Sequence, residues 1–305
     1  MTDRVAAVPV ERRRSSPAGL GYGVGAYTLW GLFPAFFGLL SFTGAADILA
    51  HRVLWTLVLM GGVIVATRQT RILSGLSRRT WVLVAAGAVS ISVNWGVYVI
   101  AVLTGHVAEA ALGYFINPLL SVALGVLLFR ERLSRTGMVA IALAVVAVGV
   151  LTVAYQRIPF IALSLAVSFA LYGVVKKLTP LPPKASLTAE TLTIAPLAVI
   201  YLGYILLSQG HIAETPWQIV LLVLCGPMTA IPLLLFGAAA HRLPVVTLGV
   251  LQYLTPIMQL LWAVAIRHEH LSPTTWAGFG LVWAALLIFT GDALRQVFAR
   301  AKRTT

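Results

Sequence analysis

Apolar residues fill the chain in long, nearly uninterrupted runs that are separated by short polar segments. A membrane-spanning helix needs about 20 apolar residues, because each residue adds only about 1.5 Å to its length. Ten runs meet this requirement, at residues 18–41, 45–67, 80–103, 107–129, 134–155, 158–177, 188–208, 216–240, 244–266 and 273–292. We therefore predict an all-α polytopic membrane protein with ten transmembrane helices and a short tail at each end, residues 1–17 and 293–305.

The composition agrees with this pattern. Hydrophobic residues make up 59% of the chain and charged residues only 10%, whereas a soluble domain carries about 25% charged residues. The first apolar run follows Arg12, Arg13 and Arg14, an arrangement also found in signal peptides, but it is too long for one and other spans follow it. We predict that it is retained as the first helix. The single cysteine, Cys225, excludes an internal disulfide.

The basic residues alternate with the predicted spans. Of the 22 Lys and Arg residues, 19 fall on one side when the ten spans are threaded through a membrane, Arg157 and Arg267 fall on the other side, and Arg52 lies inside the second span. Cytoplasmic loops carry such an excess of positive charge. We therefore predict a cytoplasmic-membrane protein with both termini in the cytoplasm, and the net charge of +13 does not indicate a nucleic-acid partner.

The two halves of the chain share a pattern at an offset of 138 residues. Pro118 and Pro256 correspond, and so do the Glu-x-Leu-Ser segments that begin at Glu131 and Glu269. Each half holds five spans, so the second half is inverted relative to the first. We predict two inverted repeats, residues 18–155 and 156–292, an arrangement typical of transporters that bind solute between the repeats near mid-membrane. The alternative is chance similarity between apolar helices.

Polar residues recur at helical spacing on several spans. Ser90, Asn94 and Tyr98 follow one another at i+4, as do Ser164, Ser168, Tyr172 and Lys176. Such stripes face either neighbouring helices or a cavity. We predict that a substrate cavity is lined by Tyr27, Trp30, Asn94, Tyr98, Tyr114, Asn117, Tyr172, Thr229, Gln252 and Tyr253. The alternative is that these groups only hydrogen-bond adjacent helices.

Charged residues inside the spans form a second candidate set. A buried ion is costly and is usually paired, so Arg52 is expected to pair with Glu109 or Asp47 in the outer half of the membrane. Glu190, at the predicted start of the seventh span, is expected to lie near Lys176 and Lys177 on the inner side. We interpret these as a gate or a purely structural clasp, and no ligand spacing supports a metal site.

Several segments together resemble RarD-type permeases of the EamA family, within the drug/metabolite transporter superfamily. They include "DILAHRVLW", "NWGVYV", "EAALGYFINPLLSVALGVLLFRERLS" and "TAIPLLLFGAAAHRL", and the resemblance extends over nearly the whole chain. It implies ten helices in two inverted repeats and the export or exchange of small metabolites or drugs. Two departures stand out: Ala111 replaces a usual serine, and "RHEHLS" is more basic than the family pattern, so that Glu269 is expected to pair locally.

From these observations we predict a secondary transporter for a small metabolite or drug-like solute, without a cofactor, that acts by alternating access and most simply as an exporter. Protons are a candidate coupling ion. A membrane scaffold or receptor that does not transport is the main alternative. A membrane-embedded enzyme is the other, although no catalytic constellation stands out. The sequence specifies neither the substrate nor the oligomeric state.

Overall fold

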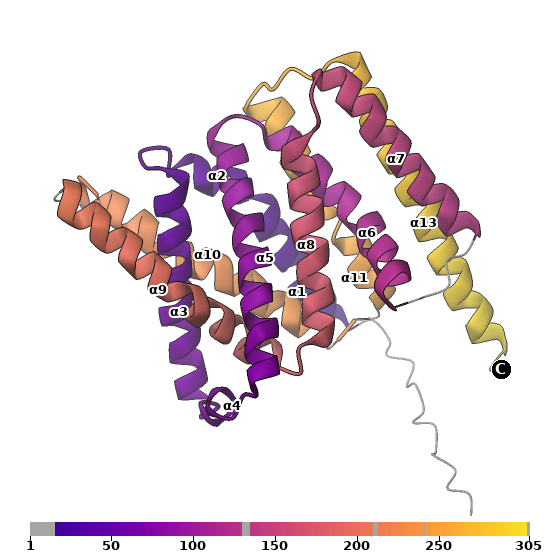
Figure 1. Ribbon diagram of the computed structural model, residues 1–305. Coiled ribbons are helices and arrows are strands. Elements are labelled where there is room, and N and C mark those ends of the chain that lie inside the picture. The colour runs from indigo at the N-terminus through magenta and orange to yellow at the C-terminus, as the bar shows by residue number, and fades with distance from the viewer. Residues whose placement is uncertain (1–15, 130–134, 210–212, 241, 244, 304–305) are drawn as a thin grey trace, which may run out of the picture.

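The computed structural model describes residues 16–129, 135–209, 213–240, 242–243 and 245–303, and all regular structure within these ranges is helical (Figure 1). The helices are α1 Pro17–Gly31, α2 Phe33–Gly38, α3 Ala45–Ala66, α4 Arg71–Ser74, α5 Arg78–Leu103, α6 Val107–Phe129, α7 Arg135–Tyr155, α8 Phe160–Leu178, α9 Pro183–Gln209, α10 Pro216–Ala240, α11 Val245–Leu251, α12 Leu254–Leu261, the π-helical turn Trp262–Ile266 and α13 Pro273–Arg303. Most of the predicted N-terminal tail and Glu131 lie outside the described residues.

Seven of the described helices are long and apolar enough to cross a membrane: α3, α5, α7, α8, α9, α10 and α13. They coincide with seven of the ten predicted spans, and α6 coincides with an eighth. Two helices run beyond their predicted spans: α9 begins at Pro183 rather than near residue 188, and α13 continues to Arg303 rather than ending near residue 292. Proline is favoured in the first helical turn, where its missing N–H group is not needed. Glu190 therefore lies about two turns inside α9.

The other two predicted spans are interrupted. The span predicted at residues 18–41 divides into α1 and α2 at Leu32, just before Pro34. The span predicted at 244–266 divides into α11 and α12 at Gln252 and Tyr253, and then passes into a π-helical turn. Helices that are interrupted at membrane depth leave backbone groups without intrahelical partners, and these groups become available to other helices.

Contacts between distant segments assemble the bundle. α8 lies between α5 and α6, α3 lies between α9 and α10, and α7 packs beside α13 at one edge (Figure 1). Small residues permit close approach: a Cβ atom added at Gly113 on α6 would lie 2.6 Å from the carbonyl oxygen of Ala162 on α8. Leucines such as Leu207 and Leu287 are 89% and 75% exposed, as expected for an outer surface that contacts lipid.

Candidate functional site

One end of α8 is held by an ion pair with α6. Arg157, just before α8, donates from Nη2 to Oε2 of Glu109 at 2.7 Å. The other carboxylate oxygen of Glu109 accepts from the backbone N–H of Ile161 at 3.1 Å, in the first turn of α8. A carboxylate is favourable there because the first N–H groups of a helix lack intrahelical partners. We call Glu109 and Arg157 the outer clasp, after the predicted orientation.

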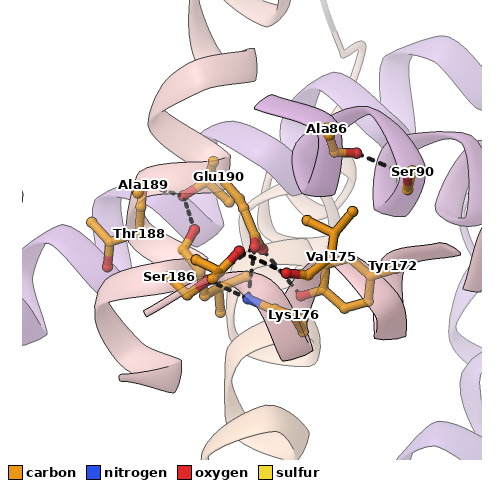
Figure 2. Close-up of polar contacts among 12 residues, drawn as sticks. Ala86, Ser90, Tyr172, Val175, Lys176, Ser186, Thr188, Ala189 and Glu190 are labelled. Carbon is orange, nitrogen blue, oxygen red and sulfur yellow. Dashed lines mark hydrogen bonds and ion pairs between the residues drawn. The ribbon is translucent and has the colours of Figure 1, made fainter. Parts of the chain in front are cut away.

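The other end of α8 is held by a second ion pair, with α9. Nζ of Lys176 lies 2.6 Å from Oε1 of Glu190, and Ser186 donates to the same oxygen at 3.0 Å. The Tyr172 hydroxyl donates to Oε2 of Glu190 at 3.0 Å (Figure 2). Glu190 is only 2% exposed, and this set of donors replaces the water that its carboxylate loses. We call Lys176 and Glu190 the inner clasp; the predicted proximity of the two residues is confirmed.

Arg52 lies in the interior without a carboxylate, so the predicted pairing with Glu109 or Asp47 is wrong. Neither the Glu109–Arg157 pair nor the Lys176–Glu190 pair includes Arg52. Its Nε donates to the Thr229 hydroxyl at 2.8 Å, and its guanidinium carbon lies 4.1 Å from the ring centroid of Trp95. This close approach is a cation–π contact, which lowers the cost of burying the charge.

The acidic residues expected beside Arg52 have other partners for local reasons. Asp47 is in the first turn of α3 and accepts from Thr43 at 2.6 Å and from the N–H of Gly44 at 3.0 Å, as helix-capping residues do. Its second oxygen accepts from Tyr201 on α9 at 2.9 Å. Capping and an interhelical hydrogen bond therefore occupy Asp47, whereas Glu109 is occupied by Arg157.

Glu269 also differs from its expected local pairing. Its two carboxylate oxygens accept from the backbone N–H groups of Val107 and Ala108 at 2.8 and 2.9 Å. These are orphan donors at the start of α6. Glu269, which follows the ninth predicted span, thus caps the start of α6, which is the fourth predicted span. This contact connects the two halves of the chain.

The polar stripe on α5 is joined to α6 and α8. The Asn94 side chain donates to the Leu165 carbonyl at 3.0 Å and to Ser168 at 3.1 Å, and its oxygen accepts from Tyr114 at 3.2 Å. These bonds are of the kind that packs helices, and Asn94 is 1% exposed. Asn117 is partly exposed and accepts from Ser121 at 3.3 Å.

In the second half, the polar stripe contacts the interrupted helix α1. Thr255 donates to the carbonyl of Tyr27 at 2.8 Å, and Gln259 donates to that of Trp30 at 3.2 Å. Both carbonyls lie near the end of α1, and that of Trp30 belongs to the last turn, where intrahelical partners run out. The Tyr27 hydroxyl in turn donates to the Leu248 carbonyl at 3.4 Å. Trp30, Gln252 and Tyr253 are partly exposed.

A small cavity lies between α3, α5 and α9. Its volume is about 10 Å³, which is room for about one water molecule. Its walls include Trp95, whose ring contacts Arg52, and Glu190 of the inner clasp. Of the residues predicted to line a substrate cavity, none lines this one, so that their lining role stays a prediction.

Sequence reasoning missed Arg157 and Thr229 as the partners of Glu109 and Arg52. Arg157 carried a signal, because it is one of only two basic residues in the predicted outer loops. Thr229 was predicted to face the cavity, but nothing in the sequence paired it with Arg52, 177 residues away.

Comparison with known proteins finds one matching family and several similar proteins. The EamA-like transporter family matches the chain twice, over residues 17–153 and 156–291. The chain is 49% identical to Protein RarD of Streptomyces exfoliatus over 91% of this chain and 89% of that protein. It is 43% identical to the uncharacterized transporter YojE of Bacillus subtilis (strain 168), over 89% and 93%.

It is also 38% identical to Protein RarD of Escherichia coli (strain K12), over 90% of this chain and 95% of that one. A solved crystal structure with 21% sequence identity covers 90% of this chain and 98% of its own, with a TM-score of 0.56, and so shares the fold. With its apolar helices and two matching halves, the chain belongs to the EamA-like transporter family and is a RarD-type, multi-pass membrane permease.

Proposed function

We propose that the protein is a secondary transporter that exports a small metabolite or drug-like solute across the cytoplasmic membrane by alternating access. The observation that carries this proposal is the fastening of α8 at both ends, by Glu109–Arg157 at one end and Lys176–Glu190 at the other. α8 has 19 residues, about 28 Å at 1.5 Å per residue, which matches the thickness of the hydrocarbon layer of about 30 Å. The two clasps therefore lie near opposite membrane surfaces.

The helix contacts support two inverted repeats around this helix. In an inverted repeat, each span corresponds to the span five places further along the chain. Exchanging corresponding spans converts the α1–α10 contact into the α8–α5 contact, and the α3–α10 contact into the α9–α5 contact. The α1–α12 contact likewise becomes the α8–α6 contact. All six of these helix–helix contacts are present. The pairs α3 with α9 and α7 with α13 map onto themselves. This exchange of contacts favours two inverted repeats over chance similarity between apolar helices.

The clasps act as gates in this proposal. Opening the inner clasp would release α8 from α9 and admit solute from the cytoplasm, whereas opening the outer clasp would release α8 from α6. Because opening the inner clasp leaves the buried carboxylate of Glu190 without its cation, which is costly within a membrane, only one clasp is expected to open at a time. The partly exposed residues Tyr114, Asn117, Tyr172, Gln252 and Tyr253 are proposed to line the solute path between them.

Metabolite profiling tests the proposal. Cells that overproduce the wild-type chain, and cells that overproduce Glu190→Gln at the same membrane level, are compared by untargeted analysis of medium and cytosol. We expect at least one solute to leave the cells faster with the wild type, and the same solute to exchange across proteoliposomes that contain it. Unchanged profiles, together with no exchange of cell-extract solutes by the purified protein, would contradict transport and favour a scaffold or receptor.

A further inference from the structure

Arg52 is a buried cation whose countercharge is not supplied by the described protein. It is 3% exposed, and a guanidinium does not lose its proton in proteins. The titratable groups that act on it electrostatically are Tyr114, Cys225 and Tyr98, side chains that are ordinarily neutral at pH 7. The ion pairs of Glu109 and Glu190 involve other cations, Arg157 and Lys176. A charge held at membrane depth in this way marks a functional site.

The hydrogen bonds of Arg52 leave part of its donor set free. Nε is used by Thr229, whose hydroxyl in turn donates to the Cys225 carbonyl at 2.9 Å. This arrangement fixes the plane of the guanidinium. Nη1, by contrast, is buried and has no hydrogen-bond partner. An unsatisfied donor on a charged group is among the most costly features of a protein interior, so a ligand that accepts from Nη1 gains that energy.

A second unsatisfied donor belongs to a residue that shares aromatic neighbours with Arg52. The Tyr98 hydroxyl on α5 is buried and has no partner either. The guanidinium of Arg52 lies 5.3 and 5.4 Å from the ring centroids of Phe33 and Phe37. The ring of Tyr98 lies 6.4 and 6.1 Å from the same two rings. The Arg52 guanidinium and the Tyr98 ring therefore border one pair of phenylalanines, and Trp95, Thr229 and Tyr114 lie against them as well.

We propose that Arg52 and Tyr98 form an anion-binding site for the transported solute, which is a small organic acid that presents a carboxylate to Nη1 of Arg52 and to the Tyr98 hydroxyl. This inference rests on the proposed function and specifies its substrate class. Two donors whose side chains border the same pair of phenylalanines can serve the two oxygens of one carboxylate. The rings of Phe33, Phe37 and Trp95 favour an apolar body on the solute over a fully hydrated inorganic ion. The charge on Arg52 then excludes cationic solutes.

Binding measurements on the purified full-length protein test the site without requiring transport. Four small carboxylates of different shape (benzoate, phenylacetate, pyruvate and succinate) are compared with their primary amides, which keep the shape and lose the charge. We expect the wild type to bind at least one carboxylate about tenfold more tightly than its amide, which corresponds to about 1.4 kcal/mol. Arg52→Gln should abolish this preference, Arg52→Lys should keep part of it, and Tyr98→Phe should weaken carboxylate binding by about threefold or more.

Arg267→Gln is the matched control, because Arg267 is an exposed arginine at one end of the bundle and should leave carboxylate binding unchanged. If Arg52→Gln does not fold, the comparison of acid with amide on the wild type and the Tyr98→Phe variant still decide the matter. Three results would overturn the proposal: equal binding of acids and amides, a preference for acids that survives Arg52→Gln, or binding of chloride as tight as that of the carboxylates. Carboxylate binding without exchange across proteoliposomes would instead contradict transport, whereas exchange of neutral solutes alone would keep transport and overturn the anion site.

Discussion

Nζ of Lys176 lies 2.6 Å from Oε1 of Glu190, a carboxylate that is only 2% exposed. This ion pair joins α8 to α9. Because Glu190 is buried, its carboxylate would be costly to leave without a cation. We expect Lys176→Met and Glu190→Gln each to destabilise the protein, Lys176→Met by the larger amount, about 3–5 kcal/mol, because it leaves a buried carboxylate uncompensated. The double variant should cost less than the two single variants together. Unfolding by titration with denaturing detergent measures the coupling energy. If the stability losses of the two single variants add up to that of the double variant, the interaction between Lys176 and Glu190 does not stabilise the protein.

The outer clasp should contribute less energy than the inner one. The side chain of Arg157 is 42% exposed, so solvent screens its interaction with Glu109, and we expect a coupling of about 1 kcal/mol or less. Glu109→Gln should nevertheless cost more than Arg157→Gln, because Glu109 also accepts from the backbone of Ile161. The same unfolding assay ranks the two variants, and a larger loss for Arg157→Gln would contradict this assignment.

Close packing of α6 against α8 depends on Gly113. A Cβ atom at this position would lie 2.6 Å from the Ala162 carbonyl oxygen, so Gly113→Ala should push the helices apart and cost about 1–3 kcal/mol. Gly149 on α7 is the matched control, since a Cβ atom there would meet nothing within 4 Å. Gly149→Ala should be neutral or slightly stabilising, because alanine favours the helix. Equal unfolding transitions for the two variants would show that the α6–α8 contact tolerates the extra atom.

Cysteine labelling distinguishes solute-path residues from packing residues. In a Cys225→Ala background, Asn117→Cys and Gln252→Cys should react with small polar thiol reagents, since both positions are partly exposed. Asn94→Cys should react at least tenfold more slowly, because Asn94 is 1% exposed among α5, α6 and α8. Inert thiols at Asn117 and Gln252 would favour the packing interpretation for the whole polar stripe.

The proposed orientation is tested by reporter fusions. A fusion after residue 305 should report the cytoplasm, and a fusion in the segment between α9 and α10 should report the opposite side, because the basic residues are so unevenly distributed. Reporters on the same side would contradict an odd number of spans between the two positions.

Much of the fold was predictable because hydrocarbon imposes simple rules on a sequence. Backbone groups must be satisfied within helices and spans must reach across the bilayer, so the apolar runs located α3, α5, α6, α7, α8, α9, α10 and α13. The proximity of Lys176 and Glu190 was also predictable, since a short loop joins their helices. Proline and polar residues near Leu32 and Tyr253 marked unusual positions, but apolar length alone does not show that a helix stops there.

The tertiary structure decided what each buried charge contacts. The sequence marks Arg52, Asp47 and Glu109 as charged residues within or beside predicted spans. The partner of such a side chain depends on the direction in which its helix face points and on which distant helix meets that face. Thr229 and Arg157 reach Arg52 and Glu109 across 177 and 48 residues of sequence. The sequence by itself determined that a membrane helix carries a guanidinium at position 52. Only the packing of α3, α5 and α10 decided that this guanidinium lies against Trp95 and Thr229 and that its Nη1 has no hydrogen-bond partner. The reason is that burial and hydrogen bonding are properties of the assembled helices.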